Sequence, residues 1–348
     1  MPRKDKTSGK VSPGSFIIPG VIELVGILLL ILKLLDNDEE STSLTVNIIL
    51  ITGFVQIGTK IVSIAYFENE VQDIFLWIHK LFELHENTIL AEIIREHLYK
   101  TQKLASLVLR IIVSLFGLTY ISMIIYFYKT QYDFMKVPFI MDDYPLIHRI
   151  VSSIFLTFTT FFVVTADSTL VVLGIYLIGA FNTISSLVKT LNDSKNIPDA
   201  GKLLTDAVIF HGEVLRKLMS FYDIFYYVFL IQIATSVFFL LFHFYLLIYV
   251  LDNFAYYTMI SASLGQFGIF CIFGQIIHTT TERIFTDLYQ TVWYEMKIED
   301  QRILLMMMKI SQKTYGLKAA GMYDINLDMF IQVIKLCYSF CTILYNLA

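Results

Sequence analysis

Charged residues are scarce in this sequence, and that scarcity excludes an ordinary soluble fold. Asp, Glu, Lys and Arg account for 16% of the 348 residues, whereas hydrophobic residues account for 56%. A typical soluble domain carries about 25% charged residues. We therefore predict an all-α polytopic protein that is embedded in membrane lipid.

Cysteines and recognisable catalytic motifs are also lacking. The three cysteines, Cys271, Cys337 and Cys341, all fall inside apolar runs and show no metal-site or disulfide spacing. The chain has no Gly-rich phosphate loop, no His-Glu-x-x-His and no nucleophile elbow. No run of basic residues suggests a nucleic-acid partner. We predict no enzymatic activity, no cofactor, no metal and no nucleic acid.

Long apolar runs, in contrast, are abundant. Seven of them are long enough to cross a bilayer as a helix. They cover 16–35, 44–67, 104–128, 151–178, 225–250, 256–277 and 327–347. The sequence therefore predicts seven transmembrane helices.

The distribution of basic residues sets the predicted orientation. Of the 26 lysines and arginines, 19 lie in the N-terminus and in the loops that share its side of the membrane. Cytoplasmic loops carry such an excess, so we predict a cytoplasmic N-terminus and an extracellular C-terminus. The resulting divisions are a cytoplasmic N-terminus at 1–15, helices one to four at 16–178, a cytoplasmic segment at 179–224, helices five and six at 225–277, cytoplasmic helices at 278–326 and a last helix at 327–348.

The cytoplasmic segments have amphipathic patterns. Residues 68–103 read as a helical extension of span two, and residues 203–220 continue into span five. Residues 282–311 combine aromatic and apolar side chains with charges between them. We expect these helices to pack beneath the membrane and hold subunits together; solvated connecting helices are the alternative.

Asp167 lies in the middle of the fourth span. An ionisable residue at membrane depth is a functional candidate. The alternative is a structural hydrogen-bond acceptor, for which Lys60 and Arg110 are candidate partners.

The last span carries one continuous polar stripe. Spacings of three and four residues place its members on one side of a helix. They are Asp328, Gln332, Lys335, Ser339, Thr342 and Asn346. Such a stripe is costly in hydrocarbon unless it faces protein or water. It indicates either a helix that lines an ion pathway in an oligomer or a helix–helix seam joined by hydroxyls and amides.

The outer halves of spans two, three, four and six are rich in aromatic and bulky apolar residues. We predict that they frame an apolar ligand pocket; ordinary lipid-facing and packing side chains are the alternative. The candidate ligand-binding residues are Phe54, Ile57, Phe116, Tyr120, Phe155, Phe158, Phe162, Tyr256, Tyr257 and Ile260.

The last seventy residues resemble the insect odorant receptor family. The resemblance rests on Tyr289, Trp293 and Tyr294, on residues 302–313 and 317–323, and on residues 326–344. It implies a seven-span protein that forms a heterotetrameric, odorant-gated, non-selective cation channel with a co-receptor, in the plasma membrane of sensory neurons. The partners it implies are therefore co-receptor subunits and a small volatile odorant.

The same resemblance assigns roles within the last helix. It implies a pore lined by this helix, with a hydrophobic gate at Ile343 and a polar ring at Asn346, next to Thr342 and Ser339 on the stripe. Because 179–224 lacks the long insertion of the co-receptor, the chain is expected to be an odorant-tuning subunit, with 16–178 as the ligand-binding bundle and 278–326 as the anchor helices. A G-protein-coupled-type chemoreceptor and a secondary transporter are the alternatives.

Overall fold

The computed structural model describes residues 14–34, 41–84, 88–131, 145–192, 200–249, 254–319 and 321–347. Within these ranges the chain is helical except for one short hairpin, a 3-10 turn and the connections, which confirms the all-α prediction. The helices are α1 (Gly14–Leu34), α2 (Ser41–Tyr66), α3 (Glu68–Phe82), α4 (Ile89–Thr130), α5 (Pro145–Thr190), α6 (Ala200–Tyr249), α7 (Phe254–Tyr289), α8 (Ile298–Ser311) and α9 (Leu327–Leu347). The hairpin pairs β1 (Lys318–Ala319) with β2 (Tyr323–Asp324), and the 3-10 turn η2 is Trp293–Glu295.

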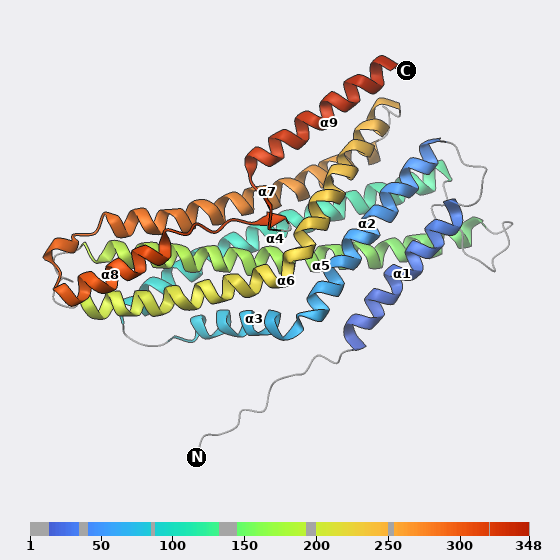
Figure 1. Ribbon diagram of the computed structural model, residues 1–348. Coiled ribbons are helices and arrows are strands. Elements are labelled where there is room, and N and C mark those ends of the chain that lie inside the picture. The colour runs from blue at the N-terminus through green and yellow to red at the C-terminus, as the bar shows by residue number, and fades with distance from the viewer. Residues whose placement is uncertain are drawn as a thin grey trace.

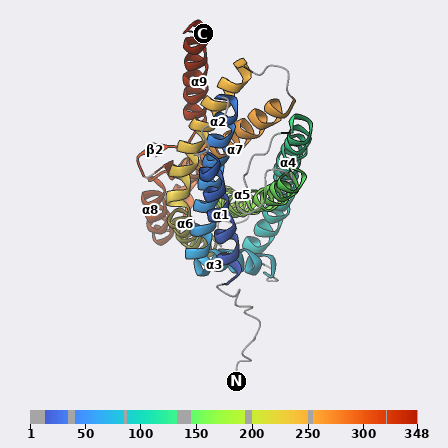
Figure 2. The same ribbon diagram turned by 90° about the vertical axis from the view of Figure 1, so that its right-hand side faces the viewer.

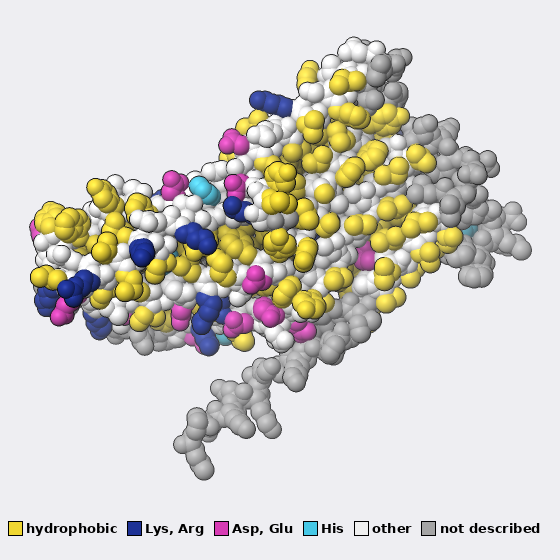
Figure 3. Space-filling view, in the orientation of Figure 1, with side chains coloured by type: hydrophobic (Ala, Val, Ile, Leu, Met, Phe, Trp, Pro, Cys, Tyr) yellow, Lys and Arg dark blue, Asp and Glu magenta, His cyan; other side chains and the backbone are white. Residues whose placement is uncertain are grey.

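The molecule is elongated and has two distinct halves. Helices α4, α5, α6 and α7 run through both halves, whereas α1, α2 and α9 lie in one half and α3 and α8 in the other (Figures 1 and 2). Charged side chains gather over the half that contains α3 and α8, and hydrophobic side chains dominate the visible surface of the other half (Figure 3). Within the described ranges, five helices, α2 and α4 to α7, are long and apolar enough to span a membrane. We call the two halves the charged half and the apolar half.

The helices are longer than the apolar runs that predicted them. Helix α5 continues to Thr190 and α7 to Tyr289, so both leave the apolar half without a break. Helix α6 begins at Ala200, which confirms that the 203–220 segment continues into the fifth span.

The prediction that 68–103 extends span two as one helix was wrong. Helix α3 ends at Phe82, and a new helix begins at Ile89. Thr88 caps α4, because its Oγ1 accepts a hydrogen bond from the Ala91 backbone N–H at 3.2 Å. The second part of the segment therefore belongs to the helix of span three, and α3 is a separate helix whose buried side packs against the charged half of the bundle.

The core consists of two clusters. The larger one follows α5, α6 and α7 along the charged half and reaches α9 through Val333 and Cys337. The smaller one lies in the apolar half and joins α1, α2, α4, α6 and α7. We call this smaller group the outer cluster; its buried members are Leu30, Val46, Ile49, Phe54, Met123, Phe127, Leu246, Ala255, Tyr256 and Met259.

Candidate functional site

A buried polar triad ties three membrane helices together. The Lys60 ammonium on α2 contacts Oδ1 of Asp167 on α5, and Gln266 Nε2 on α7 donates to Asp167 Oδ2 at 2.7 Å. Lys60 and Asp167 are 1% and 3% exposed. The Lys60 Nζ also lies 5.6 Å from the centre of the Phe270 ring, within range of a cation–π interaction.

The triad decides between the two candidate partners of Asp167. Lys60 is the partner, and Arg110 is exposed on α4. Both carboxylate oxygens of Asp167 are engaged and closed off from solvent, so this geometry favours the structural interpretation. A charge buried in this way is tolerated because it is paired and hydrogen-bonded.

Two predicted ligand residues, Phe54 and Tyr256, belong to the outer cluster, and a third, Phe155, packs against it. The rings of Phe54 on α2 and Phe155 on α5 lie 5.4 Å apart, and Tyr256 on α7 belongs to the same group. Gly26 on α1 makes room for them, because a Cβ at this position would lie 2.3 Å from the Phe155 ring. The outer cluster thus combines aliphatic and aromatic side chains, and Phe155 of α5 packs against it beside Phe54.

Hydroxyl groups border the outer cluster. The Tyr126 and Tyr256 hydroxyls are 2.9 Å apart, and their rings 5.5 Å apart. Ser122 Oγ and Thr258 Oγ1 form a buried hydrogen bond. We did not predict Ser122, Tyr126 or Thr258; the spacing of four between the first two, on one face of an apolar helix, was the available signal.

The other predicted ligand residues are more scattered. Ile57 and Ile260 are buried, and Phe116 packs at the edge of the larger core cluster. Tyr120 forms a hydrogen bond with Thr157 Oγ1 at 2.8 Å, while Phe162 is half-buried beside Phe161.

Phe158 and Tyr257 lie on the outside of the bundle. Their side chains are 48% and 45% exposed in the single chain. This position suits contact with lipid or with a neighbouring subunit, so their assignment to the pocket stays a prediction.

Glu23 on α1 is a second buried carboxylate that sequence reasoning missed. It is 2% exposed, and neither carboxylate oxygen has a hydrogen-bond partner in the part of the chain that the structure describes. The signal was present in the sequence, since Glu23 is the acidic residue within the first apolar run.

Helix α9 turns its polar stripe away from the rest of the chain. Val333 and Cys337 are buried on the side that packs against α6 and α7. On a helix of 3.6 residues per turn, the stripe falls on the opposite side, and Ser339, Thr342 and Asn346 are all exposed. Ile343, at the edge of the stripe, is 58% exposed.

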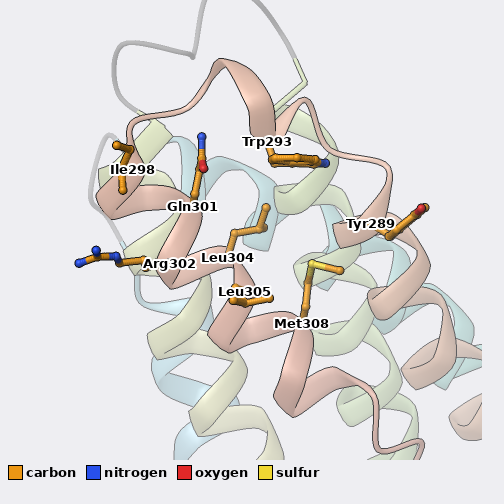
Figure 4. Close-up of a pocket in the computed structure, with 8 residues that line it drawn as sticks. All are labelled: Tyr289, Trp293, Ile298, Gln301, Arg302, Leu304, Leu305 and Met308. Atoms are coloured by element: carbon orange, nitrogen blue, oxygen red, sulfur yellow. The ribbon is translucent and has the colours of Figure 1, made fainter.

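The charged half presents an apolar groove of about 400 Å³ between η2 and α8. In Figure 4, Trp293, Leu304 and Met308 face a common space, and Tyr289 stands at its edge. Leu305 and Ile298, also at the groove, are 67% and 69% exposed. Exposed apolar side chains gathered in this way are typical of an interaction surface.

The long apolar helices, set against a charged half, define a polytopic helical membrane protein. The chain belongs to the 7tm odorant receptor family, whose pattern it matches over residues 40–338. Proteins of this family are receptors and not enzymes.

The solved structures show the same fold. Two structures of the insect olfactory receptor OR5 from Machilis hrabei superpose on this chain, with a TM-score of 0.80 for one and 0.79 for the complex with eugenol. Each comparison covers 100% of this chain and 93% of OR5, at 12% identity.

Two Drosophila melanogaster proteins are similar in sequence over short stretches. Odorant receptor 33b is 30% identical over 77 residues, which is 22% of this chain and 20% of that receptor. Putative odorant receptor 83c is 24% identical over 81 residues, or 23% of this chain and 20% of that protein. The chain thus matches about a fifth of the length of these relatives.

Proposed function

We propose that this chain is the odorant-tuning subunit of an odorant-gated, non-selective cation channel, which it forms as a heterotetramer with co-receptor subunits in the plasma membrane of sensory neurons. The family supports a receptor for odorants. The observation that carries the channel is the polar stripe of α9, which lies opposite the packed side of the helix and is open in the single chain. Several such stripes around an axis would enclose a hydrophilic path.

The ligand site of this proposal is the outer cluster. Phe54, Phe155 and Tyr256 supply an apolar surface, and the hydroxyls of Tyr126 and Tyr256 supply polar groups that orient a small molecule. OR5, which shares the fold, has been solved in complex with eugenol. A ligand that binds the open conformation more tightly than the closed one shifts the population toward conduction.

The gate of this proposal is Ile343. A ring of isoleucines at a narrow point excludes water, and withdrawal of the ring lets water and cations enter. Ile343 is exposed beside Thr342 and Asn346, near the end of α9 that lies farthest from the charged half.

The test is to record currents from cells that express this chain with an insect odorant co-receptor, across a broad panel of odorants and without added G-protein components. We expect fast, odorant-evoked cation currents. Ile343→Ala should raise the resting current, because a smaller side chain leaves the constriction wetted. Ile331→Ala, which truncates another exposed isoleucine of α9, is the matched control.

Unchanged resting and evoked currents in Ile343→Ala would contradict the assignment of the gate to Ile343.

Phe155→Ala should reorder the potencies of the odorants more than Phe161→Ala, which alters an exposed ring on the same helix. Saturable uptake of a substrate without unitary currents would instead support a transporter.

A further inference from the structure

A second hollow lies where the connection between α8 and α9 crosses α6. Its volume is about 380 Å³. Met219, Tyr222, Tyr226 and Phe229 line it from α6, and Lys313 and Lys318 line it from the connection. The odorant site and the polar stripe of α9 do not use any of these residues.

The hollow lies at the boundary between the two halves of the molecule. Asp223 is the last of the Asp, Glu, Lys and Arg residues in α6. The rest of the helix, residues 224–249, contains none of these four residue types. Lys313 and Lys318, on the connection, face the point at which this uncharged stretch begins. Because the fifth span is predicted to begin at Phe225, we expect this to be the height of the lipid head groups.

The connection is held firmly at this height. Thr281 Oγ1 on α7 donates to the Tyr315 carbonyl at 3.0 Å and accepts from the Tyr315 N–H at 3.1 Å. The Ile325 N–H donates to the Leu317 carbonyl at 2.9 Å, which closes the hairpin. These hydrogen bonds fix the connection in place, so it forms a stable wall of the hollow.

The groups around the hollow combine positive charge, a hydroxyl and apolar surface. The Lys313 ammonium lies 5.4 Å from the centre of the Tyr315 ring, and Lys318 Nζ lies 3.5 Å from Asp324 Oδ1. Two lysines against one aspartate leave an excess of one positive charge. The Tyr222 hydroxyl is closed off from solvent and has no hydrogen-bond partner in the described part of the chain.

We propose that this hollow binds an anionic phospholipid of the leaflet next to the charged half. Lys313 and Lys318 contact the phosphate, and the acyl chain lies along Met219 and Phe229. Basic pockets between membrane helices recognise lipid head groups by this chemistry. Because β2 ends at Asp324 and α9 begins at Leu327, the bound lipid stabilises the position from which α9 starts.

The experiment uses the full chain in nanodiscs of phosphatidylcholine, with or without phosphatidylserine, and follows hydrogen exchange of the backbone at 313–319. Phosphatidylserine should slow this exchange. Lys313→Gln and Lys318→Gln should each raise the phosphatidylserine content needed for half of the protection about fivefold, since one lysine near an anionic surface contributes about that factor. Lys297→Gln, outside the hollow, is the matched control and should leave the phosphatidylserine content at half protection unchanged.

Three results would overturn the proposal. An equal loss of protection in Lys297→Gln would show that phosphatidylserine acts through the general surface charge of the protein and not through the hollow. Faster exchange of the Lys313 and Lys318 variants in pure phosphatidylcholine would show that these lysines only hold the hairpin in place. Equal protection by inorganic phosphate would identify a site for free anions. None of these results depends on odorant-evoked current, so a failure here is distinct from a failure of the channel proposal.

Discussion

At the scale of single residues, the most consequential contact is the buried pair of Lys60 and Asp167. Sequence reasoning found both residues as ionisable groups inside apolar spans. It did not pair them, because they are 107 residues apart and Arg110 was an equal candidate. Which charges meet depends on the packing of α2 against α5, and no local pattern contains that information.

Asp167→Asn should destabilise the protein by about 3–5 kcal/mol, because it leaves the buried ammonium of Lys60 without its counter-charge. Thermal unfolding of the purified protein in detergent measures the change. Asp328→Asn, at an exposed position of α9, is the control and should have little effect.

Replacing both charges at once, with Lys60→Met and Asp167→Leu, should recover much of the lost stability, because no charge is left buried alone. If Asp167→Asn unfolds at the temperature of the unaltered protein, the pair has no structural role.

At the scale of elements, local patterns predicted the helices well and their breaks poorly. Apolar runs identified seven spans because hydropathy is a local property of about 20 residues. The break after Phe82 was missed because the amphipathic pattern continues on both sides of it. The outer cluster was found in part, since its aromatic residues are visible in the sequence but the direction in which each ring points is not.

The approach of the hairpin connection to α7 leads to a prediction at this scale. A Cβ on Gly274 would lie 2.0 Å from the Ile325 carbonyl oxygen, which is backbone and cannot rotate away. Gly274→Ala should therefore push the connection away from α7 and destabilise the protein by about 1–3 kcal/mol. The midpoint of thermal unfolding measures the effect.

The control for this substitution is Gly117→Ala in α4, where an added Cβ meets nothing within 4 Å. Alanine favours a helix over glycine by up to about 1 kcal/mol, so this variant should be as stable as the unaltered chain or more so. Equal destabilisation by both substitutions would contradict a specific contact at Gly274.

At the scale of the whole molecule, the charged half and the apolar half predict which side of the membrane each terminus faces. The start of α1 lies near the charged half, and the end of α9 lies far from it (Figure 1). An epitope tag at the N-terminus should therefore stay hidden from antibody on intact cells, whereas a C-terminal tag should be labelled. Permeabilised cells supply the control for expression. Labelling of the N-terminal tag on intact cells would favour a G-protein-coupled-type receptor.

The groove between η2 and α8 is the second feature at this scale. We expect it to contact a neighbouring subunit, so Leu305→Glu should reduce co-purification with the co-receptor about tenfold or more, because a carboxylate would be buried in an apolar interface. Leu76→Glu places the same charge on α3, where the leucine is 59% exposed, and should leave co-purification intact. Normal assembly of Leu305→Glu would exclude the groove from the interface.

The buried pair also constrains the order in which the protein is made. Lys60 leaves the ribosome 107 residues before Asp167, so at about 5–20 residues per second it waits roughly 5–20 s for its partner. During that interval an unpaired lysine within a membrane helix costs at most about 2.5–3.5 kcal/mol, the value for the centre of the helix, since Lys60 lies six residues before the end of α2. Helix α2 therefore inserts less favourably than its apolar length suggests until α5 has been synthesised, and pairing with Asp167 then removes that cost.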